Sequence, residues 1–474
     1  MLFIMKKIPF HYNKLLTGLL LVAAMAPSCK RLIDIPANPP TQITEAQQFA
    51  DSATTMTAIA GIYSYPTGSS YGSFTFNNGY LSLYTGLSGD ELLPASSGAA
   101  DDLQFYSNSV TVFNGILNSL WSDPYRGLYP VNAALKDITA SSGLSASLKK
   151  QLTGEMKVVR ALYYFYLVNL FGDVPLVTST DYNATAMIPR TSIDSIYGQI
   201  LTDLTDAQQA LPKDYPSTGR VRPNLYTVDA FLSKVYLYRQ EWQKAYDAAS
   251  TVIGSGEYAL EPDLNNVFLD GSQEAIWQLP ANSQNGATTE ALHFLPNYGS
   301  PAKYLMTPAL LSAFESGDIR LQKWAMQTVV NVGGTNQTLY NPYKYKNINE
   351  SAPTVEDFMI FRLGELYLIR AEAAAQLGNM TTALADLNAV RVRAGLGAST
   401  ASSQADVLSA IQHERQTELF TEWGSRWLDL KRTGTMNAVL GVAKPGWKAT
   451  DSLYPVPYPQ IQADNLLTQN PGYN

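Results

Sequence analysis

The sequence predicts a mostly α-helical protein with an irregular lobe of loops and short strands inserted among the helices. Apolar residues recur at helical spacing over long stretches of the chain. Other stretches lack that period and are rich in Gly, Ser, Asn and aromatic residues. We therefore expect a helical scaffold at about residues 40–62, 112–260 and 355–435, and an irregular lobe at about 63–111 and 262–350.

The first 28 residues have the features of a secretory signal peptide. Three lysines come first without any acidic residue, and the following residues 15–26 are almost all apolar or small. This apolar run is about half of the ~20 residues that a membrane-spanning helix needs, so we do not expect a permanent span. We predict that residues 1–28 are removed and that residues 29–474 form one domain, with Met5 as an alternative start.

The residue after the predicted cleavage site, Cys29, is the only cysteine in the chain. This placement resembles the lipobox of bacterial lipoproteins, in which the thiol carries acyl chains that anchor the protein to a membrane. Because no second cysteine is present to form a disulfide, we predict that Cys29 is the point of lipid attachment. The alternative is an ordinary signal peptide cleaved nearby, with Cys29 as a free thiol.

Composition limits the classes of function. Loss of the signal peptide with its three lysines changes the net charge from −7 to −10, which argues against binding to nucleic acid or anionic lipid. Only 15% of the residues are charged, against about a quarter in typical proteins. The chain has 29 tyrosines and seven tryptophans instead. This balance favours a neutral polar ligand.

The helical stretches can be placed in order along the chain. Residues 154–172 carry apolar residues at helical spacing from Val158 to Phe165, and Gly172 ends the stretch. Residues 191–211 begin with a Thr/Ser cap and repeat the spacing. Both stretches predict helices that bury one face.

Two later stretches, residues 227–253 and 361–395, each predict two helices joined by a short turn. They align with each other across the turn, and Ala245 matches Ala383. Small residues at such positions let paired helices approach closely. The pattern resembles the tetratricopeptide helix–turn–helix without its regular spacing of about 34 residues, which predicts a short, irregular helical solenoid.

Short strands are expected in the irregular lobe. The segments "EAIWQLP" (274–280) and "QTVVNV" (327–332) carry apolar residues typical of strands beside Gly, Asn and Pro turns. Long irregular segments in a compact protein are usually functional or disordered, and the many aromatic residues here favour order.

Three acidic residues near the C-terminus raise the question of catalysis. Glu414, Glu418 and Glu422 lie four residues apart, on one face of a predicted helix. Glycoside hydrolysis needs two carboxylates about 5–10 Å apart in a cleft. Arg415 and Arg426 alternate with these acids, so we interpret the set as structural charge pairs. A surface glycoside hydrolase remains the enzymatic alternative.

The residues that bind metals are scarce. After loss of the signal peptide, His293 and His413 are far apart and no pair of thiols exists, which argues against zinc. Residues 263–274 begin like a calcium loop but carry Val267 and Phe268 at positions that need a ligand and a glycine. We expect no cofactor and no catalytic triad, while a structural Ca²⁺ held by carboxylates from distant segments stays open.

Aromatic recognition is the remaining option for a binding site. The apolar faces of a sugar stack on aromatic rings, and its hydroxyls form hydrogen bonds with polar side chains. The alternative for each ring is a place in the core. We select rings in or just after irregular segments, together with nearby polar residues, as candidate ligand contacts: Tyr71, Tyr80, Tyr298, Tyr304, Trp324, Asn78 and Asp102.

An ordered set of motifs spans the chain after the signal peptide. Its stretches are "CKRLIDIPAN" (29–38), "LWSDPYRGLYPVNAAL" (120–135), "GEMKVVRALYYFYLVNLFGDVPLV" (154–177), "IPRTSIDSIYGQILTDLTDAQQALP" (188–212), "FRLGELYLIRAEAAAQLG" (361–378), "ERQTELFTEWGSRWLDLKRTG" (414–434) and "LYPVPYPQIQADNLLTQNPGYN" (453–474). In this order the set resembles the SusD/RagB family of outer-membrane nutrient-binding lipoproteins.

The resemblance implies a fold and a function. The fold would be mostly α, with about four tetratricopeptide-like helix pairs and an inserted irregular lobe. The protein would be lipid-anchored in the outer membrane, facing the cell exterior. It would capture a glycan without catalysis and deliver it to a SusC-type TonB-dependent transporter. A peptide-binding member of the same family and a helical-repeat assembly scaffold are the alternatives.

Overall fold

The computed structural model describes residues 44–64, 76, 79–95, 99–281, 286–296, 301–332, 334–349 and 355–473. The chain divides into two units, Met1–Gln48 and Phe49–Asn474. In the first unit the described part is the short helix α2 (Glu45–Gln48), and the predicted signal peptide and Cys29 lie outside the described residues. The second unit holds the scaffold and the lobe.

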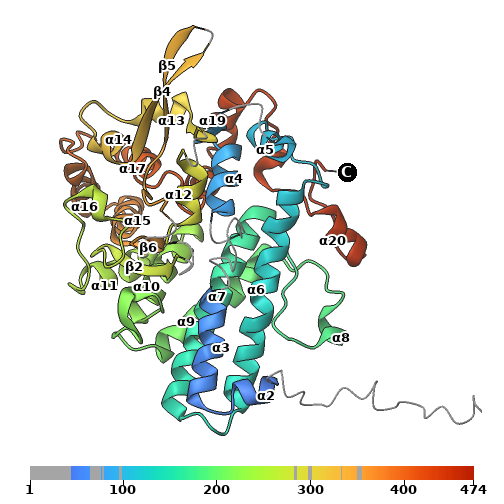
Figure 1. Ribbon diagram of the computed structural model, residues 1–474. Helices are drawn as coiled ribbons and strands as arrows, with labels where there is room; N and C mark the ends of the chain where they lie inside the picture. Colours follow the sequence, from blue (N-terminus) through green and yellow to red (C-terminus); the bar gives the residue numbers. More distant parts are fainter. Residues whose placement is uncertain are drawn as a thin grey trace, which may run out of the picture. The chain divides into compact units, whose positions relative to one another are not determined.

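Long helices form one half of the second unit, and Figure 1 shows several of them side by side. The helix predicted at 154–172 is longer than expected, because Ser145 caps it by accepting a hydrogen bond from the Leu148 N–H (3.2 Å). Every residue from Val158 to Phe171 is buried, so this helix is the centre of the core. These helices are α3 (Ser52–Ser64), α6 (Gly115–Ala140), α7 (Ala146–Phe171) and α9 (Ile193–Ala210).

Two helix pairs form the predicted helix–turn–helix units. The predicted turns are confirmed, with positive φ at Gln240 (58°) and at Gly378 (81°). Ala245 and Ala383 are fully buried where the paired helices cross, which confirms the alignment of the two units. The pairs are α10 (Leu225–Tyr238) with α11 (Trp242–Ile253), and α15 (Leu363–Gln376) with α16 (Met380–Arg393).

The helix expected around residues 413–432 is interrupted. The segment forms α17 (Gln404–Glu418) and α18 (Ser425–Arg432), joined by residues with positive φ at Thr421, Trp423 and Gly424. Non-glycine residues rarely adopt this conformation, so the turn is held by its surroundings. Glu422 therefore does not lie on a helix with Glu414 and Glu418, as the sequence had suggested.

Antiparallel two-stranded ladders run through the inserted lobe. The strands predicted at 274–280 and 327–332 are present. The register pairs Pro94 with Tyr304, which brings two distant segments together. The ladders are β1 (Leu92–Pro94) with β3 (Tyr304–Met306), β2 (Ala275–Pro280) with β6 (Asp357–Arg362), and β4 (Ala325–Val332) with β5 (Thr335–Pro342).

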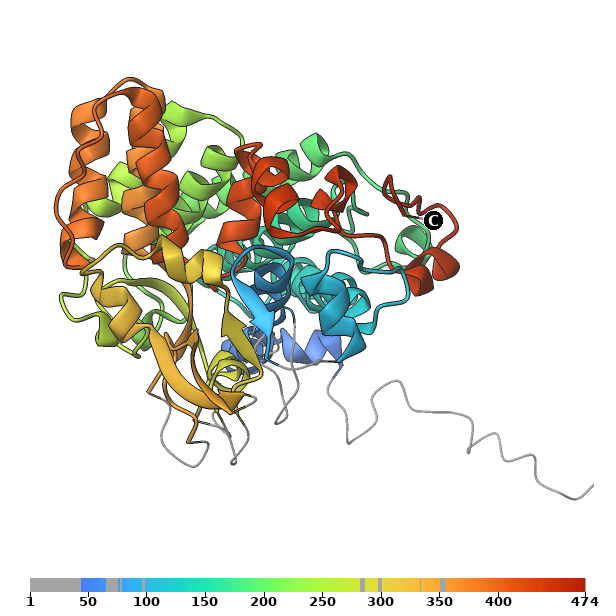
Figure 2. The ribbon, with the colours of Figure 1, turned by 90° about the horizontal axis from the view of Figure 1, so that it is seen from above.

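Short helices make the lobe more regular than the sequence suggested, and Figure 2 shows them packed around the strands. Side chains cap three of them, since Thr288, Thr307 and Asp318 each accept a backbone N–H at a helix start. The lobe helices are α4 (Tyr80–Ser88), α5 (Ala100–Tyr106), α12 (Thr289–Phe294), α13 (Pro308–Ala313) and α14 (Ile319–Lys323). The remaining short helices are α8 (Tyr182–Thr185), α19 (Met436–Ala443) and α20 (Tyr458–Ala463).

The last residues of the chain close the end of the central helix α7. The Tyr454 N–H donates to the Leu170 carbonyl (2.9 Å), and the Asn470 side-chain amide donates to the Phe171 carbonyl (2.9 Å). Arg190 also donates to the Phe171 carbonyl (3.0 Å). A helix end leaves carbonyls without partners inside the helix, and here distant segments supply the donors.

Candidate functional site

The structure brings three of the predicted ligand contacts together. Tyr80 begins α4, Asp102 lies in the first turn of α5, and Tyr304 begins β3. The β1–β3 ladder holds Tyr304 against the two helices. The predicted contacts Tyr71, Asn78 and Tyr298 lie outside the described residues.

Two tyrosine hydroxyls hold the carboxylate of Asp102. Tyr84 donates to Oδ1 (3.1 Å) and Tyr304 donates to Oδ2 (2.8 Å). Burial, followed by the negative charge of Asp102, raises the pKa of both tyrosines well above the usual value. Both phenols therefore stay protonated as donors at any physiological pH. We call Tyr80, Tyr84, Asp102 and Tyr304 the tyrosine–aspartate cluster.

Tyr80 gives this cluster its accessible surface. Its ring packs edge-on against Tyr84, with centroids 5.2 Å apart and planes at 84°. Tyr80 is partly buried, whereas Tyr84, Tyr304 and Asp102 are almost completely buried. Tyr80 can therefore meet a ligand directly. The prediction that Tyr304 and Asp102 contact a ligand is wrong in this structure, because both side chains are buried and hydrogen-bonded to each other. Of the three buried residues, Tyr84 packs against the ring of Tyr80.

The buried imidazole of His293 and the ring of Phe294 also pack against Tyr304. The ring of His293 lies 6.3 Å from that of Tyr304, and the ring of Phe294 lies 6.5 Å from it. Burial, followed by the charge of Lys303, lowers the pKa of His293 to about 3. The imidazole is thus neutral near pH 7. Gly79 fits closely here, because a Cβ at that position would lie 3.2 Å from His293 Cδ2.

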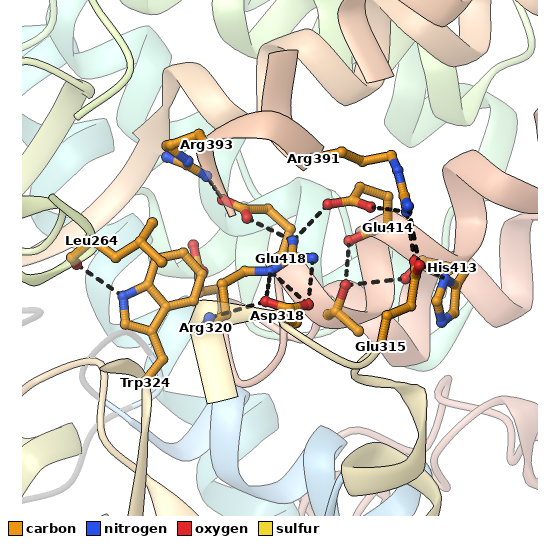
Figure 3. Close-up of polar contacts among 12 residues, drawn as sticks. Leu264, Glu315, Asp318, Arg320, Trp324, Arg391, Arg393, His413, Glu414 and Glu418 are labelled. Carbon is orange, nitrogen blue, oxygen red and sulfur yellow. Dashed lines mark hydrogen bonds and ion pairs between the residues drawn. The ribbon is translucent and has the colours of Figure 1, made fainter. Parts of the chain in front are cut away.

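The prediction that Trp324 contacts a ligand is wrong in this structure. Its side chain is fully buried, and its indole N–H donates to the Leu264 carbonyl (2.9 Å), as Figure 3 shows. Phe268 and Phe420 pack against its ring, and the Lys344 Nζ lies 4.7 Å from the ring centroid. A ring without an exposed face cannot stack on a sugar, so Trp324 belongs to the core.

The three glutamates considered for catalysis are buried in ion pairs, which confirms their structural interpretation. Arg320 contacts Glu414 (2.7 Å) and Glu418 (3.0 Å), and Figure 3 shows its guanidinium between them. Arg362 contacts Glu418 (2.6 Å) and Glu422 (2.8 Å). We call these five residues, with Asp318, Lys344, Arg391 and Arg393, the arginine–glutamate network.

The predicted partners of these glutamates were wrong. Arg415 pairs with Asp429 (2.7 Å), and Arg426 pairs with Asp90 (2.6 Å). Although burial alone would raise the pKa of Glu418, the surrounding arginines hold it far below its usual value. A carboxylate held ionised in this way cannot serve as the general acid of a glycosidase.

Metal ligands do not converge in the part of the chain that the structure describes. No three His, Cys, Asp or Glu side chains there come together in a way that could hold a metal ion. Nor does any described helix combine the length and the apolar character needed to cross a bilayer.

Comparison with known proteins identifies the family. Residues 82–237 match a family model described as starch-binding and associating with the outer membrane, and residues 238–473 match the model of the SusD family. The chain belongs to the SusD/RagB family. Its mostly helical, tetratricopeptide-like fold with an inserted lobe is the fold of SusD-family structures.

Individual relatives of this SusD-family chain are distant in sequence. SusD-like protein P2 of Formosa agariphila is 26% identical over 423 residues, covering 76% of this chain and 81% of that protein. Starch-binding protein SusD of Bacteroides thetaiotaomicron is 23% identical over 437 residues, covering 70% and 75%. The structure of a laminarin-binding SusD-like protein has a TM-score of 0.75 and 24% identity, covering 89% of this chain and 100% of that one.

Some residues of the site were not selected from the sequence. Tyr84 lies one helical turn after Tyr80, so helical spacing could have found it once α4 was recognised. Asp123 lies in the distant helix α6, yet its charge contributes to the raised pKa of Tyr80, after burial. No local signal connects Asp123 to Tyr80, because tertiary packing of α6 makes that contact.

Proposed function

We propose that this SusD-family protein captures a neutral oligosaccharide at the cell surface and delivers it to a SusC-type TonB-dependent transporter. In this proposal it acts without catalysis or cofactor. The observation that carries the binding step is the partly exposed ring of Tyr80. It packs edge-on against Tyr84, whose hydroxyl is held on Asp102 together with that of Tyr304. The starch and laminarin named for its relatives support a glycan as the ligand class.

Binding is tested by calorimetric titration of residues 29–474 carrying Cys29→Ser. The probes are maltohexaose, laminarihexaose and a peptide digest. We expect a micromolar to millimolar response to one glucan. Tyr80→Ala should weaken it at least tenfold, which is about 1.4 kcal/mol, because the stacking face is lost.

Matched variants separate the ring from its surroundings. Tyr80→Phe keeps the ring and should retain most of the affinity. Heat released only with peptides would support the peptide-binding alternative, and silence towards all three probes would contradict the proposal. An unchanged affinity of Tyr80→Ala would remove Tyr80 from the site while leaving glycan binding intact.

The location is proposed through Cys29. Acylation there would hold the protein on the outer membrane, facing the exterior, where the transporter takes up the glycan. Cys29→Ala should abolish incorporation of labelled palmitate and release the protein from the membrane fraction. Deletion of the protein should also slow uptake of the bound glycan, and co-purification with a TonB-dependent transporter tests the partner.

A further inference from the structure

A cavity of about 470 Å³ lies on the helical half of the molecule, and none of its lining residues belongs to the tyrosine–aspartate cluster. Helix α6, the segment from Pro175 to Ile188 with α8, and the C-terminal segment with α20 form its walls. Figures 1 and 2 both show α8 and α20 beside α6. The polar and aromatic residues of the lining are Trp121, Ser122, Tyr125, Arg126, Thr185, Gln460 and Asp464.

Hydrogen bonds between its walls fix the shape of this cavity. Tyr125 donates through its hydroxyl to the Pro175 carbonyl (2.9 Å), which joins α6 to the following segment. The Ile188 N–H donates to Asp464 Oδ2 (3.0 Å). Gln460 joins α20 to α6 through the Asn118 side chain (3.0 Å). A cavity of this size with preformed walls falls in the range of ligand sites, about 300–1,000 Å³.

The charges in the lining favour a neutral ligand. Arg126 and Asp464 are its two charged residues, and their charges cancel. Arg126 also pairs with Asp123 (3.0 Å), and Asp464 accepts N–H groups from Ile188 and Leu466 with its two oxygens. An anionic or cationic ligand would therefore meet no excess of opposite charge.

Exposed aromatic rings lie on or next to the elements that form the cavity, close in sequence to its lining residues. Among the described residues the exposed aromatic side chains are Phe113, Tyr129, Tyr182 and Tyr458, with 40–78% of their surface accessible. Tyr129 lies one turn beyond Tyr125 in α6, and Tyr182 and Tyr458 begin α8 and α20. Phe113 packs on Tyr458 with centroids 4.9 Å apart. Exposed aromatic groups gathered around a hollow are typical of binding surfaces.

We propose that this cavity is a second saccharide-binding site, which takes a short neutral segment of a glycan. Tyr182 and Tyr458 offer their rings to the sugar faces, and Arg126, Gln460 and Asp464 meet the hydroxyls. The ligand class rests on the proposed function, but the residues are different. The two sites share helix α6, because Asp123, the partner of Arg126, lies near Tyr80.

The test is a titration of the mature chain with maltohexaose and laminarihexaose, followed by calorimetry and by hydrogen exchange of residues 175–188 and 458–467. We expect two binding events and protection of both segments. The double variant Tyr182→Ala/Tyr458→Ala should lose one event and this protection. Tyr80→Ala should lose only the other event.

Controls keep the outcome interpretable. Tyr182→Phe/Tyr458→Phe keeps both rings and should bind as wild type. Both positions are exposed enough for the variants to fold, which thermal unfolding checks. A single binding event that the alanine pair leaves unchanged and Tyr80→Ala removes would overturn the second site while the proposed function stands. No binding of either glucan would overturn both proposals.

Discussion

Trp324 and Tyr80 have neighbours of the same kinds, but Trp324 is fully buried whereas Tyr80 is partly exposed. Both combine aromatic rings with charged groups from distant segments. Beside Trp324 the charged groups form the arginine–glutamate network (Figure 3), and its members Lys344, Arg362 and Arg393 lie within 5.9 Å of the ring centroid. Around Tyr80 a single carboxylate, Asp102, is held by two phenols, and the Tyr80 side chain is partly exposed. The number and placement of the charged groups therefore differ between a fully buried ring and a partly exposed one.

One helix forms the boundary between the two regions. Helix α12 directs His293 and Phe294 towards Tyr304, while its Glu290 lies with Lys344 and Thr421 around a very small cavity. Glu290 accepts a hydrogen bond from Ser82 (2.7 Å), and Ser82 accepts one from the Trp423 N–H (3.1 Å). Helix α12 therefore contacts both regions, and the effect of a substitution around Trp324 can be compared with the effect of one around Tyr80.

The largest effect is expected from opening the arginine–glutamate network. Arg320→Met should lower the free energy of unfolding by about 3–5 kcal/mol, because Asp318, Glu414 and Glu418 lose a buried partner. Urea unfolding measures the change. The control is Arg239→Met at the exposed pair with Asp194, where about 1 kcal/mol or less is expected. Equal losses in the two variants would contradict this account.

Removal of the buried ring should come next. Trp324→Ala should cost about 3–5 kcal/mol of stability through loss of packing among Phe268 and Phe420. The folded fraction should nevertheless bind glycan within about twofold of wild type. Trp324→Phe, which fills more of the space, should be less destabilised. A large loss of glycan affinity with unchanged stability would show that Trp324 contacts the ligand.

Glu290, on the helix between the two regions, should make the stability of the protein depend on pH. Burial raises its pKa to about 7 from the ordinary 4.5, so the folded protein binds more protons than the unfolded chain between these values. Stability from this group is complete at low pH and falls as the pH rises from about 4.5 to 7, by about 1.4 kcal/mol per pKa unit.

The comparison of wild type with Glu290→Gln isolates this group. Glu290→Gln should lack the loss of stability that ionisation of Glu290 causes. The difference between the free energies of unfolding of wild type and variant, followed over pH 4–8, measures this loss. His293 acts in the opposite sense, because its lowered pKa removes stability as the pH falls below about 6.5, but it is present in both proteins. A constant difference across the range would show that Glu290 does not titrate there.

The smallest effects concern the two phenols on Asp102. Tyr304→Phe removes the shorter hydrogen bond and should cost about 1–2 kcal/mol, and Tyr84→Phe, with the longer bond, should cost less. Both variants should also weaken glycan binding modestly, because Tyr80 loses part of its support. Thermal unfolding ranks the two variants by stability, and titration ranks them by glycan affinity. A larger loss in Tyr84→Phe than in Tyr304→Phe would contradict the order of the two hydrogen-bond lengths.

The features that were predictable from sequence depend on neighbours along the chain. The helix–turn–helix units around Gln240 and Gly378 were found because periodicity and turn chemistry are local. The nearness of Tyr80, Asp102 and Tyr304 depends instead on the pairing of β1 with β3. These residues were selected from the composition of their segments, which could not predict that the two strands pair.

The errors concern contacts between distant segments. Trp324 follows a short polar stretch and looked accessible, yet Leu264, 60 residues earlier, accepts its indole N–H. Glu414 has Arg415 beside it in sequence, but its partners Arg320 and Arg391 come from other elements. On a helix, adjacent residues point in different directions, so charge alternation along the chain says little about pairs across the core.

The closure of α7 by the last residues has a consequence for the order in which the molecule is completed. The carbonyls of Leu170 and Phe171 receive donors from Tyr454 and Asn470, which the ribosome adds almost 300 residues later. In a nascent chain the Phe171 carbonyl has its donor from Arg190 early, whereas the Leu170 carbonyl receives the Tyr454 N–H only when synthesis is almost complete. A product shortened by 22 residues would lack the donors from Tyr454 and Asn470 and one wall of the cavity, so premature termination removes part of the structure around the end of α7 and not only a tail.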